Sequence, residues 1–396
     1  MSRLAYIGPI AAIGMVAYAL PIFILIHGLL ADGMLISLVN RDFVNYWVAG
    51  NLVLEGEHLD LFNQQVYFAR LQELFGRDFP IHNWGYPPHF LLLIWPLGFL
   101  SYKTGLVLFL LAGLALFLFA VWKFKRQYAP LADGKLLLIA IVAYGLMMID
   151  TTQNGFLTAA LLLLGLTFKD SRPILAGLAF GLLTIKPQLG LLLPLYLLFE
   201  RNWAAIFWSV VFTAVLVAVS AAVFGTASWV AYLTDTLEYQ RFVMTDWYGI
   251  FLAMMPTVFG AARSLGLPPE TAYALQWPVS IVTLMAVIWL LRQDRDPLRR
   301  IFIFVCGTFL VSPYALNYDM GALAVIAALI LGSTEERGHW QLWSIGAIAA
   351  LPAAVMNLGR AGLPIAPLLL AAGLIAIWAM NESSSQSTWT AGHRSA

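Results

Sequence analysis

A carboxylate stands beside aromatic residues just after the first apolar stretch of the chain, in the run Asn40-Arg41-Asp42-Phe43 followed by Tyr46. At a membrane rim, loss of water raises the pKa of a carboxyl, whereas a neighbouring Arg lowers it. An ionised Asp42 within hydrogen-bond reach of a hydroxyl could act as a general base. Asp42 is also placed to be the N-cap of a following helix. Spacing alone favours the cap, and the two roles are compatible.

A single basic residue interrupts the apolar stretch that runs from Leu175 to Phe199, in the sequence Lys186-Pro187-Gln188. The proline breaks the helix at this point. An ionisable residue inside such a stretch indicates a functional site, and an ammonium at a helix break can pair with a lipid phosphate. The alternative is a lysine whose charged end extends to the membrane interface. The adjoining Pro-Gln slightly favours a functional role.

Two polar clusters could contact a lipid-linked ligand. Tyr86 and His89 flank a pair of prolines before an apolar run, 90–100, that is too short to span a membrane and suits a re-entrant or interfacial helix. For His89 alone, a place in an aromatic interfacial belt is the favoured interpretation. Gln153 and Asn154 lie in a polar turn between two apolar stretches, where they could bind sugar hydroxyls or simply form a capped turn.

Two further segments supply candidates for an acceptor site. Asn317, Tyr318 and Asp319 follow a Ser-Pro break in another apolar run. A carboxylate before a span is often a cap, but this break is the third polar one expected on the same side of the membrane. Glu238 and Arg241 lie in a long polar loop, where solvated charges need no special explanation.

The elements that must position these residues are membrane-spanning helices. The 396 residues are 61% hydrophobic and 11% charged, whereas soluble domains carry about 25% charged residues. The 22 Lys and Arg nearly balance the 21 Asp and Glu, which argues against a nucleic-acid-binding protein. The single cysteine, Cys306, excludes an intramolecular disulfide. The composition therefore predicts an all-α polytopic membrane protein.

The apolar stretches predict about twelve transmembrane helices, because a span needs about 20 apolar residues. Seven candidates are clear: 7–30, 103–123, 134–150, 204–224, 271–292, 341–357 and 364–380. Five shorter runs can span only when tilted or completed by flanking residues: 155–168, 173–185, 188–199, 299–311 and 319–332. The count falls to eleven if 173–199 forms one kinked helix.

Basic residues gather in the loops that a twelve-span arrangement places on the N-terminal side. The positive-inside rule then predicts that both termini are cytoplasmic. Residues 1–380 form one transmembrane domain with two long outer loops. The first, 31–102, is predicted to hold two amphipathic surface helices and the re-entrant helix, and the second covers 225–270. The Ser-rich tail, 381–396, is predicted to be disordered.

Several motifs, in this order and spacing, resemble those of glycosyltransferase family 87, which belongs to the GT-C superfamily of polytopic transferases. The resemblance extends from Arg41 to about Met320. The motifs are Asp42-Phe43 with Tyr46 and Trp47, Tyr86-Pro87-Pro88, Lys186-Pro187-Gln188 after Gly177-Leu178-Ala179, and Ser312-Pro313 followed by Asp319.

The resemblance implies a GT-C-like fold in the cytoplasmic (inner) membrane of a bacterium, with the active site on the outer, periplasmic face. It implies inverting transfer of a sugar, most often mannose, from a polyprenyl-phosphate donor to an acceptor hydroxyl, with Asp42 as general base. Related mannosyltransferases carry a Trp and paired His after Ser-Pro, where this chain has Asn317, Tyr318 and Asp319. The sugar and acceptor therefore stay open.

The candidates fall into two groups by expected role. For the donor phosphate and sugar they are Lys186, Tyr86, His89, Gln188, Gln153 and Asn154. For the acceptor, or for support of the site, they are Arg41, Tyr46, Asn317, Tyr318, Asp319, Glu238 and Arg241. Lys186 and helix N-termini could supply the positive field for the phosphate without a metal or cofactor.

The expected partners are a lipid-linked sugar donor, a glycolipid or glycan acceptor and membrane lipids, with no nucleic acid. Two other functions fit the composition: a secondary transporter or lipid-linked-sugar flippase, and a lipid-linked glycan polymerase or ligase. The halves show no matching broken segments, which argues against the transporter. The acid-rich outer loops argue mildly against the polymerase. Phosphate-loop and hydrolase motifs are absent from the sequence.

Overall fold

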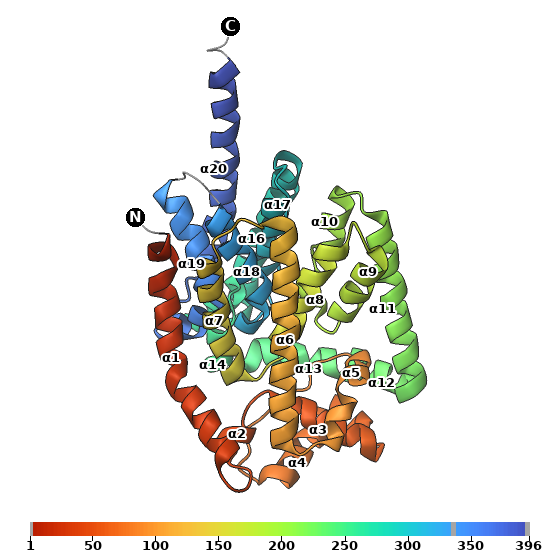
Figure 1. Ribbon diagram of the computed structural model, residues 1–396. Helices are drawn as coiled ribbons and strands as arrows, with labels where there is room; N and C mark the ends of the chain where they lie inside the picture. Colours follow the sequence, from red (N-terminus) through yellow and green to blue (C-terminus); the bar gives the residue numbers. More distant parts are fainter. Residues whose placement is uncertain (1–2, 334–337, 393–396) are drawn as a thin grey trace.

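The computed structural model describes residues 3–333 and 338–392, with side chains as far as Asn381 (Figure 1). The chain is 81% helix, and no strand occurs in these two ranges. Within these two ranges, six helices are long and apolar enough to cross a membrane, which supports a multi-pass membrane protein. They are α1 (Leu4–Leu30), α6 (Tyr102–Tyr128), α7 (Gly134–Thr151), α11 (Trp203–Phe224), α16 (Pro269–Gln293) and α19 (His339–Arg360).

These six helices coincide with six of the seven clear spans expected from the sequence. The other expected spans fall on helices that are shorter or, in α20, have an apolar part of only 366–381, so the count of twelve stays a prediction. Those helices are α8 (Gly155–Phe168), α9 (Pro173–Leu183), α10 (Leu193–Phe199), α17 (Pro297–Val311), α18 (Gly321–Ser333) and α20 (Ala366–Gly392). Residues 393–396 lie outside the described part, and the disorder expected for 381–396 stays a prediction.

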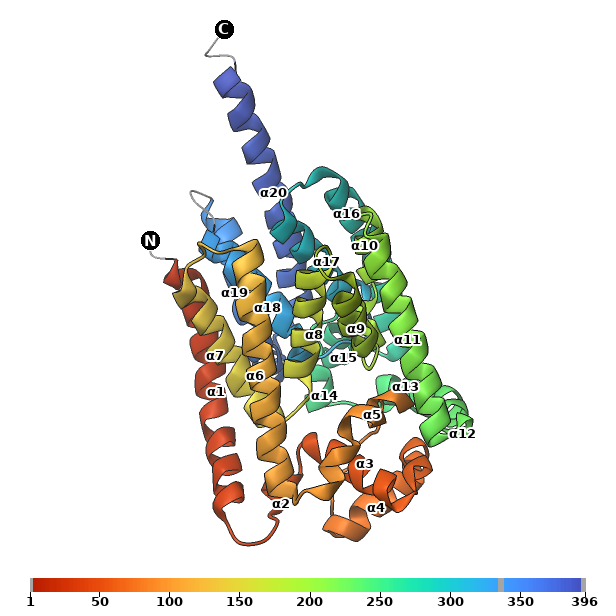
Figure 2. The ribbon, with the colours of Figure 1, turned by 45° about the vertical axis from the view of Figure 1, so that its right-hand side comes forward.

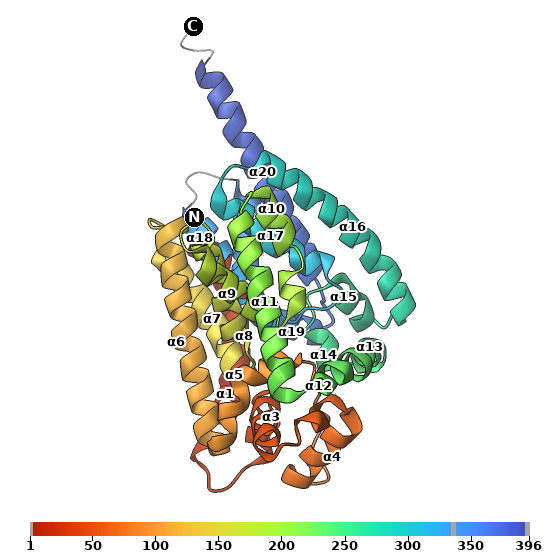
Figure 3. The same ribbon diagram turned by 90° about the vertical axis from the view of Figure 1, so that its right-hand side faces the viewer.

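The helices pack around α18, whose residues from Gly321 to Gly332 are all buried. Helices α7, α17 and α19 surround it, and α1 packs against α7 and α19. Helix α11 packs mainly on α9 at the edge of the bundle, and α16 lies at the periphery with one end splayed outwards (Figure 3). The apolar faces of α11 and α16 are largely exposed in the protein, as expected for lipid-facing helices.

The first long loop folds into a compact lobe at one end of the bundle (Figure 2). We call residues 36–99 the first-loop lobe; it supplies most of a second buried apolar cluster, to which α1 and α6 also contribute. It contains α2 (Ile36–Val39), α3 (Phe43–Glu55), α4 (Gln64–Phe75) and α5 (Leu91–Ile94), with 3₁₀ turns at His58–Phe62, Pro88–Phe90 and Trp95–Phe99.

Helix α3 differs from the amphipathic surface helix expected for its sequence. Eight of its 13 residues are buried, because the turn Trp95–Phe99 and helix α5 cover it. Gly50 makes the close approach possible: a Cβ there would lie 2.7 Å from the backbone nitrogen of Gly98. Helix α4 is more exposed. The apolar run 90–100 forms two short 3₁₀ turns around α5, and its place in a membrane stays a prediction.

The second long loop forms a series of short helices beside the first-loop lobe (Figure 1). A single π-helical turn, Tyr232–Thr236, joins the first two of them. The helices are α12 (Thr226–Ala231), α13 (Leu237–Asp246), α14 (Ile250–Ala253) and α15 (Val258–Ser264). Helix α14 packs on α19 and helix α15 packs on α16, so this loop is held against the bundle.

Candidate active site

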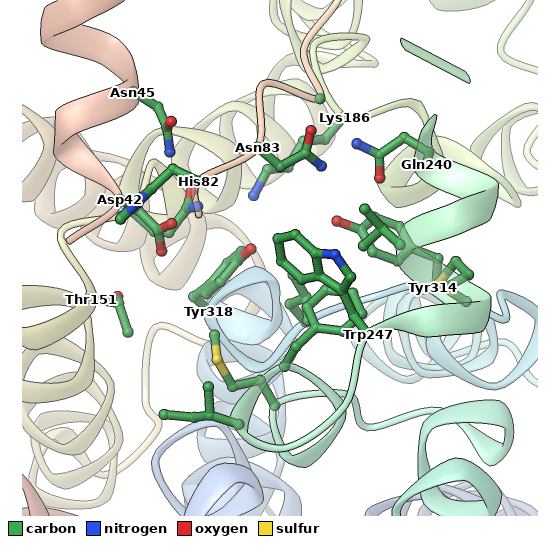
Figure 4. Close-up of a pocket in the computed structure, with 18 of the residues that line it drawn as sticks. Asp42, Asn45, His82, Asn83, Thr151, Lys186, Gln240, Trp247, Tyr314 and Tyr318 are labelled. Carbon is green, nitrogen blue, oxygen red and sulfur yellow. The ribbon is translucent and has the colours of Figure 1, made fainter. Parts of the chain in front are cut away.

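A cavity of about 860 Å³ lies between the first-loop lobe, the second long loop and the ends of the bundle helices (Figure 4). Asp42, Asn45 and His82 lie together on one side of it, and Gln240 and Trp247 lie across from them. The polar part is lined by Asn40, Arg41, Asp42, Asn45, His82, Asn83, Asp150, Thr151, Gln153, Lys186 and Gln188. The apolar part is lined by Val243, Met244, Trp247, Ile250, Phe251, Met254, Tyr273, Tyr314, Leu316 and Met356.

Asp42 occupies the N-cap position of α3, but its side chain makes no capping hydrogen bond. The backbone N–H of Phe43 instead donates to Oγ1 of Thr152, 3.0 Å away. Thr152 reaches this position because it ends α7 in the left-handed conformation, with φ 52°. The capping role that spacing favoured for Asp42 is therefore wrong. A side chain from another helix caps α3, and the Asp42 carboxyl is left to the cavity.

Burial raises the pKa of the Asp42 carboxyl above its usual range. The largest opposing influence on that pKa is His82, followed by a hydrogen bond from the Gln153 side chain and by the charge of Lys186. A carboxylate with a raised pKa is a better proton acceptor than an exposed one, as long as it is ionised at the working pH. The site therefore favours proton transfer to Asp42.

Gln153 joins Asp42 to a pair of tyrosines. Its Oε1 accepts hydrogen bonds from the hydroxyls of Tyr46 at 2.5 Å and Tyr86 at 3.1 Å, and the two hydroxyls are 2.8 Å apart. Since the carbonyl oxygen is used in this way, the amide NH₂ is the group that faces the Asp42 carboxyl. The first-loop lobe and the α7–α8 turn together fix the position of the carboxyl.

Lys186 lies at the break between α9 and the 3₁₀ turn Pro187–Gly190. Its Nζ donates to Oδ1 of Asp319 at 2.6 Å and lies 4.4 Å from the centroid of the Tyr318 ring. Both charged side chains are buried. Lys186 and Tyr318 line the cavity, whereas Asp319 lies behind them. The polar breaks at Lys186 and Asp319 were expected on the same side of the membrane, and they do lie together. They form an ion pair, which their spacing in the sequence did not predict.

Arg41 serves mainly to hold elements together. Its guanidinium pairs with the Asp150 carboxylate and also donates to the backbone oxygen of Asp150. Two further bonds go to the backbone oxygens of Pro21, at 3.1 Å, and Ser37, at 3.3 Å. These partners belong to α1, α2 and α7, so Arg41 ties the start of the first-loop lobe to the bundle.

Besides Asp319 and Tyr46, which contact cavity residues from behind, four of the expected site residues do not line the cavity. His89 is buried, with Nε2 3.2 Å from Thr184 Oγ1 and its ring stacked on Trp229. Asn317 is buried and donates to the Pro352 backbone oxygen at 3.2 Å. The side chain of Asn154 is buried with no hydrogen-bond partner among the described residues. Glu238 is exposed on α13. Their expected ligand contacts stay untested predictions, whereas Gln188 and Arg241 do line the cavity.

Several cavity residues were not among those expected from the sequence. His82 is held by stacking on Phe79 and by its Nδ1, which lies 3.0 Å from the Pro80 backbone oxygen; since that oxygen can only accept, Nδ1 carries the proton. His82 belongs to the same polar run as Tyr86, which was a usable signal. Arg360 lies at the end of α19, far away in sequence, and no local pattern links it to the site.

No three His, Cys, Asp or Glu side chains in the described ranges are grouped closely enough to hold a metal ion. Metal independence stays a prediction, because the absence of such a cluster does not identify what the reaction uses.

Comparison with known families identifies the chain. The model of glycosyltransferase family 87 matches residues 84–313, which is more than half of the 396 residues. The matched range includes Tyr86, Gln153 and Lys186. Asp42 and Asp319 lie outside it, one on each side. Neither the curated proteins nor the solved structures gave a significant match. A family of glycosyltransferases favours sugar transfer over transport. The chain belongs to glycosyltransferase family 87 and is a membrane glycosyltransferase.

Proposed function

We propose that this glycosyltransferase moves a sugar, with mannose as the first candidate, from a polyprenyl-phosphate donor to an acceptor hydroxyl on the outer face of the membrane. Asp42 is the general base, and the anomeric configuration is inverted. The observation that carries the proposal is the Asp42 carboxyl: it is free of a capping role and shares one cavity with the ammonium of Lys186.

The proposed step needs one base and one group that stabilises the leaving phosphate. Asp42 accepts the proton of the acceptor hydroxyl while that oxygen forms a bond to C1 of the sugar. The bond from C1 to the phosphate oxygen breaks, and its electron pair stays on the phosphate. Lys186 donates hydrogen bonds to this oxygen as negative charge develops there, which is electrostatic stabilisation. Base and leaving group lie on opposite faces of the sugar, as in inverting hydrolases.

The lining of the cavity supports a donor with a polar head and an apolar chain. The sugar and phosphate fit the polar part, where Tyr86, Gln153 and Gln188 supply hydroxyl and amide groups. The polyprenyl chain fits the apolar part, which Trp247 and Phe251 help to form. One cavity with both surfaces is typical of a site for an amphiphile. The acceptor then enters from the side of Asp42.

The outer-face assignment rests on the charge distribution of the loops and has its own test. Single cysteines are introduced at Asn63 and Gly362, on loops expected outside, and at Gln127, on a loop expected inside. The buried Cys306 is the only native cysteine. In intact cells an impermeant thiol reagent is expected to label the first two positions but not the third. Labelling at Gln127 overturns the orientation.

The enzymatic proposal is tested with the purified chain in detergent, polyprenyl-phosphate mannose and a membrane lipid extract as the source of acceptor. Mass analysis is expected to find an acceptor heavier by one hexose, together with free polyprenyl phosphate. Asp42→Asn serves as the negative control. Transfer from a nucleotide sugar instead, or equal product from the control, overturns the donor or the base, respectively.

A further inference from the structure

The ion pair between Lys186 and Asp319 is built in two layers. Only 7% of the Lys186 side chain and 1% of the Asp319 side chain are exposed. Lys186 faces the cavity and Asp319 stands behind it. The second carboxylate oxygen of Asp319 accepts from the backbone N–H of Leu316 at 3.4 Å. A substrate in the cavity therefore meets an ammonium whose charge is already balanced by a fixed carboxylate.

The charge of the bound phosphate changes during the proposed reaction. In the donor the phosphate is a diester with one negative charge. When the bond to C1 breaks, the electron pair remains on the phosphate, and the product is a monoester that carries close to two negative charges at pH 7, since its second pKa is about 6. A buried lysine with no counter-charge would hold this product more tightly than the donor, and product release would be slow.

We propose that Asp319 is a positioning residue that sets the charge of the phosphate subsite. By pairing with Lys186, it lets the ammonium donate hydrogen bonds to the donor diester while it limits the attraction for the more highly charged monoester that must leave. This inference rests on the proposed donor and on the proposed role of Lys186.

The geometry separates this role from two others. Asp319 is not a second base, because it does not line the cavity and its carboxylate is bound to Lys186. It is also more than a cap for its own turn. The bond to the Leu316 N–H uses Oδ2, whereas the shorter bond to Lys186 uses Oδ1 and joins segments 133 residues apart.

The test compares two ligands that carry the same farnesyl group but differ in charge. They are farnesyl phosphate, a monoester, and farnesyl methyl phosphate, a diester. Their dissociation constants are measured at pH 8 with the full-length protein in detergent. In the wild type the two constants are expected to differ by less than about threefold. In Asp319→Asn the monoester is expected to bind at least about tenfold more tightly than the diester, because an unbalanced charge at close range attracts the second negative charge.

Asp78→Asn is the matched control, since it removes a carboxylate charge from the first-loop lobe at an exposed position outside the cavity. It is expected to leave both constants unchanged. The inference is overturned if Asp319→Asn does not increase the preference for the monoester, or if the control increases it equally. A structural role alone predicts weaker binding of both ligands and no change in their ratio.

Loss of Asp319 leaves a buried lysine without its partner and can impair folding. The wild-type ratio then decides alone, because a wild type that already prefers the monoester by more than about tenfold contradicts a charge-balanced subsite. The variant Lys186→Gln/Asp319→Asn separates this inference from the proposed function. If it binds both ligands as tightly as the wild type, the phosphate site of Lys186 is wrong. If it binds both weakly while Asp319→Asn shows no preference, only the inference about Asp319 fails.

Discussion

Two ion pairs flank the cavity, one buried and one largely buried, and they use their cations differently. In the pair Arg41–Asp150, the guanidinium contacts a carboxylate and three backbone oxygens from α1, α2 and α7. In the pair Lys186–Asp319, the ammonium has one hydrogen-bond acceptor in the described part of the chain and faces the cavity. An ammonium has three N–H donors and a guanidinium has five. Lys186 therefore keeps two donors for a ligand, whereas Arg41 uses four of its five donors within the protein.

The number of unused N–H donors separates a structural cation from one that can bind a ligand. Both pairs are close to Asp42, and both cations are less than 15% exposed, so burial does not distinguish them. What distinguishes them is the number of donors that remain unused. We interpret Arg41–Asp150 as the joint that holds the first-loop lobe on the bundle, and Lys186–Asp319 as the part that meets the substrate.

The largest expected effect on activity comes from Asp42, the carboxylate of the cavity lining that belongs to neither ion pair. Asp42→Asn is expected to lower the rate of sugar transfer by about 10²–10⁴-fold, the usual contribution of a positioned base. Donor affinity and the unfolding temperature are expected to stay close to the wild-type values, because Asn has the same shape and the side chain caps nothing. Initial rates, donor binding and thermal unfolding are measured on the same preparation.

A variant that keeps more than about a tenth of the wild-type rate would remove Asp42 from the proposed mechanism, since that loss is below the range for general-base catalysis. A variant that unfolds at a clearly lower temperature would show that Asp42 stabilises the first-loop lobe. Its role would then be structural, like that of Arg41.

Matched double variants test the comparison itself. Arg41→Gln/Asp150→Asn and Lys186→Gln/Asp319→Asn each replace an ion pair by two neutral amides. The second is expected to bind polyprenyl-phosphate mannose about tenfold more weakly, because charge-assisted hydrogen bonds are about twice as strong as neutral ones. The first is expected to keep donor affinity within about twofold but to unfold at a lower temperature, because amides cannot replace the bonds of a buried guanidinium.

The dissociation constant for the donor and the unfolding temperature are measured for both variants. Equal losses of donor affinity would contradict the assignment of the two pairs to different roles.

The sequence was sufficient for the six long helices and for the positions of the polar breaks, but not for the partners of the charged residues at those breaks. Long apolar stretches predict spans directly, and Lys186, Asp42 and Asp319 stand out because charged residues are rare beside such stretches. The partner of each charge depends on packing between distant segments. Lys186 meets Asp319 across 133 residues, and Thr152 caps a helix that begins 109 residues earlier. Neither contact leaves a periodic or local signature.

The wrong expectation for α3 has the same origin. Apolar residues on one face of a short helix predict an amphipathic helix, but the pattern does not say whether other elements cover the remaining faces. Here the turn Trp95–Phe99 covers α3, in a contact that needs two glycines, Gly50 and Gly98. Two isolated glycines 48 residues apart do not predict that contact without a structure.

The pH dependence of transfer gives a smaller effect that also separates the pairs. Asp42 must be ionised to accept a proton, and burial raises its pKa. Activity is therefore expected to fall as the pH drops through a value above about 3.9, the ordinary pKa of Asp. Lys186 lowers the pKa of Asp42, so Lys186→Gln is expected to move the acid limb of the rate profile to higher pH.

The same profile for Arg41→Gln is expected to keep the wild-type acid limb, because Arg41 is not among the groups that shift the pKa of Asp42. Transfer rates with saturating donor are measured from pH 4 to pH 8. An acid limb that moves equally in both variants would show that the two cations influence Asp42 alike.

The smallest expected effect concerns the cap that leaves Asp42 free. Thr152→Val keeps the shape of the side chain but removes the hydroxyl that accepts from the Phe43 N–H. Loss of such a cap costs about 1 kcal/mol, so the unfolding temperature is expected to fall slightly and the transfer rate by a few fold, while donor affinity stays unchanged. Thr152→Ser keeps the hydroxyl and is expected to resemble the wild type in all three measurements. If Thr152→Ser is impaired as much as Thr152→Val, the methyl group rather than the hydrogen bond holds α3. The free carboxyl of Asp42 would then depend on packing between α7 and the first-loop lobe, the contact that Arg41 also secures.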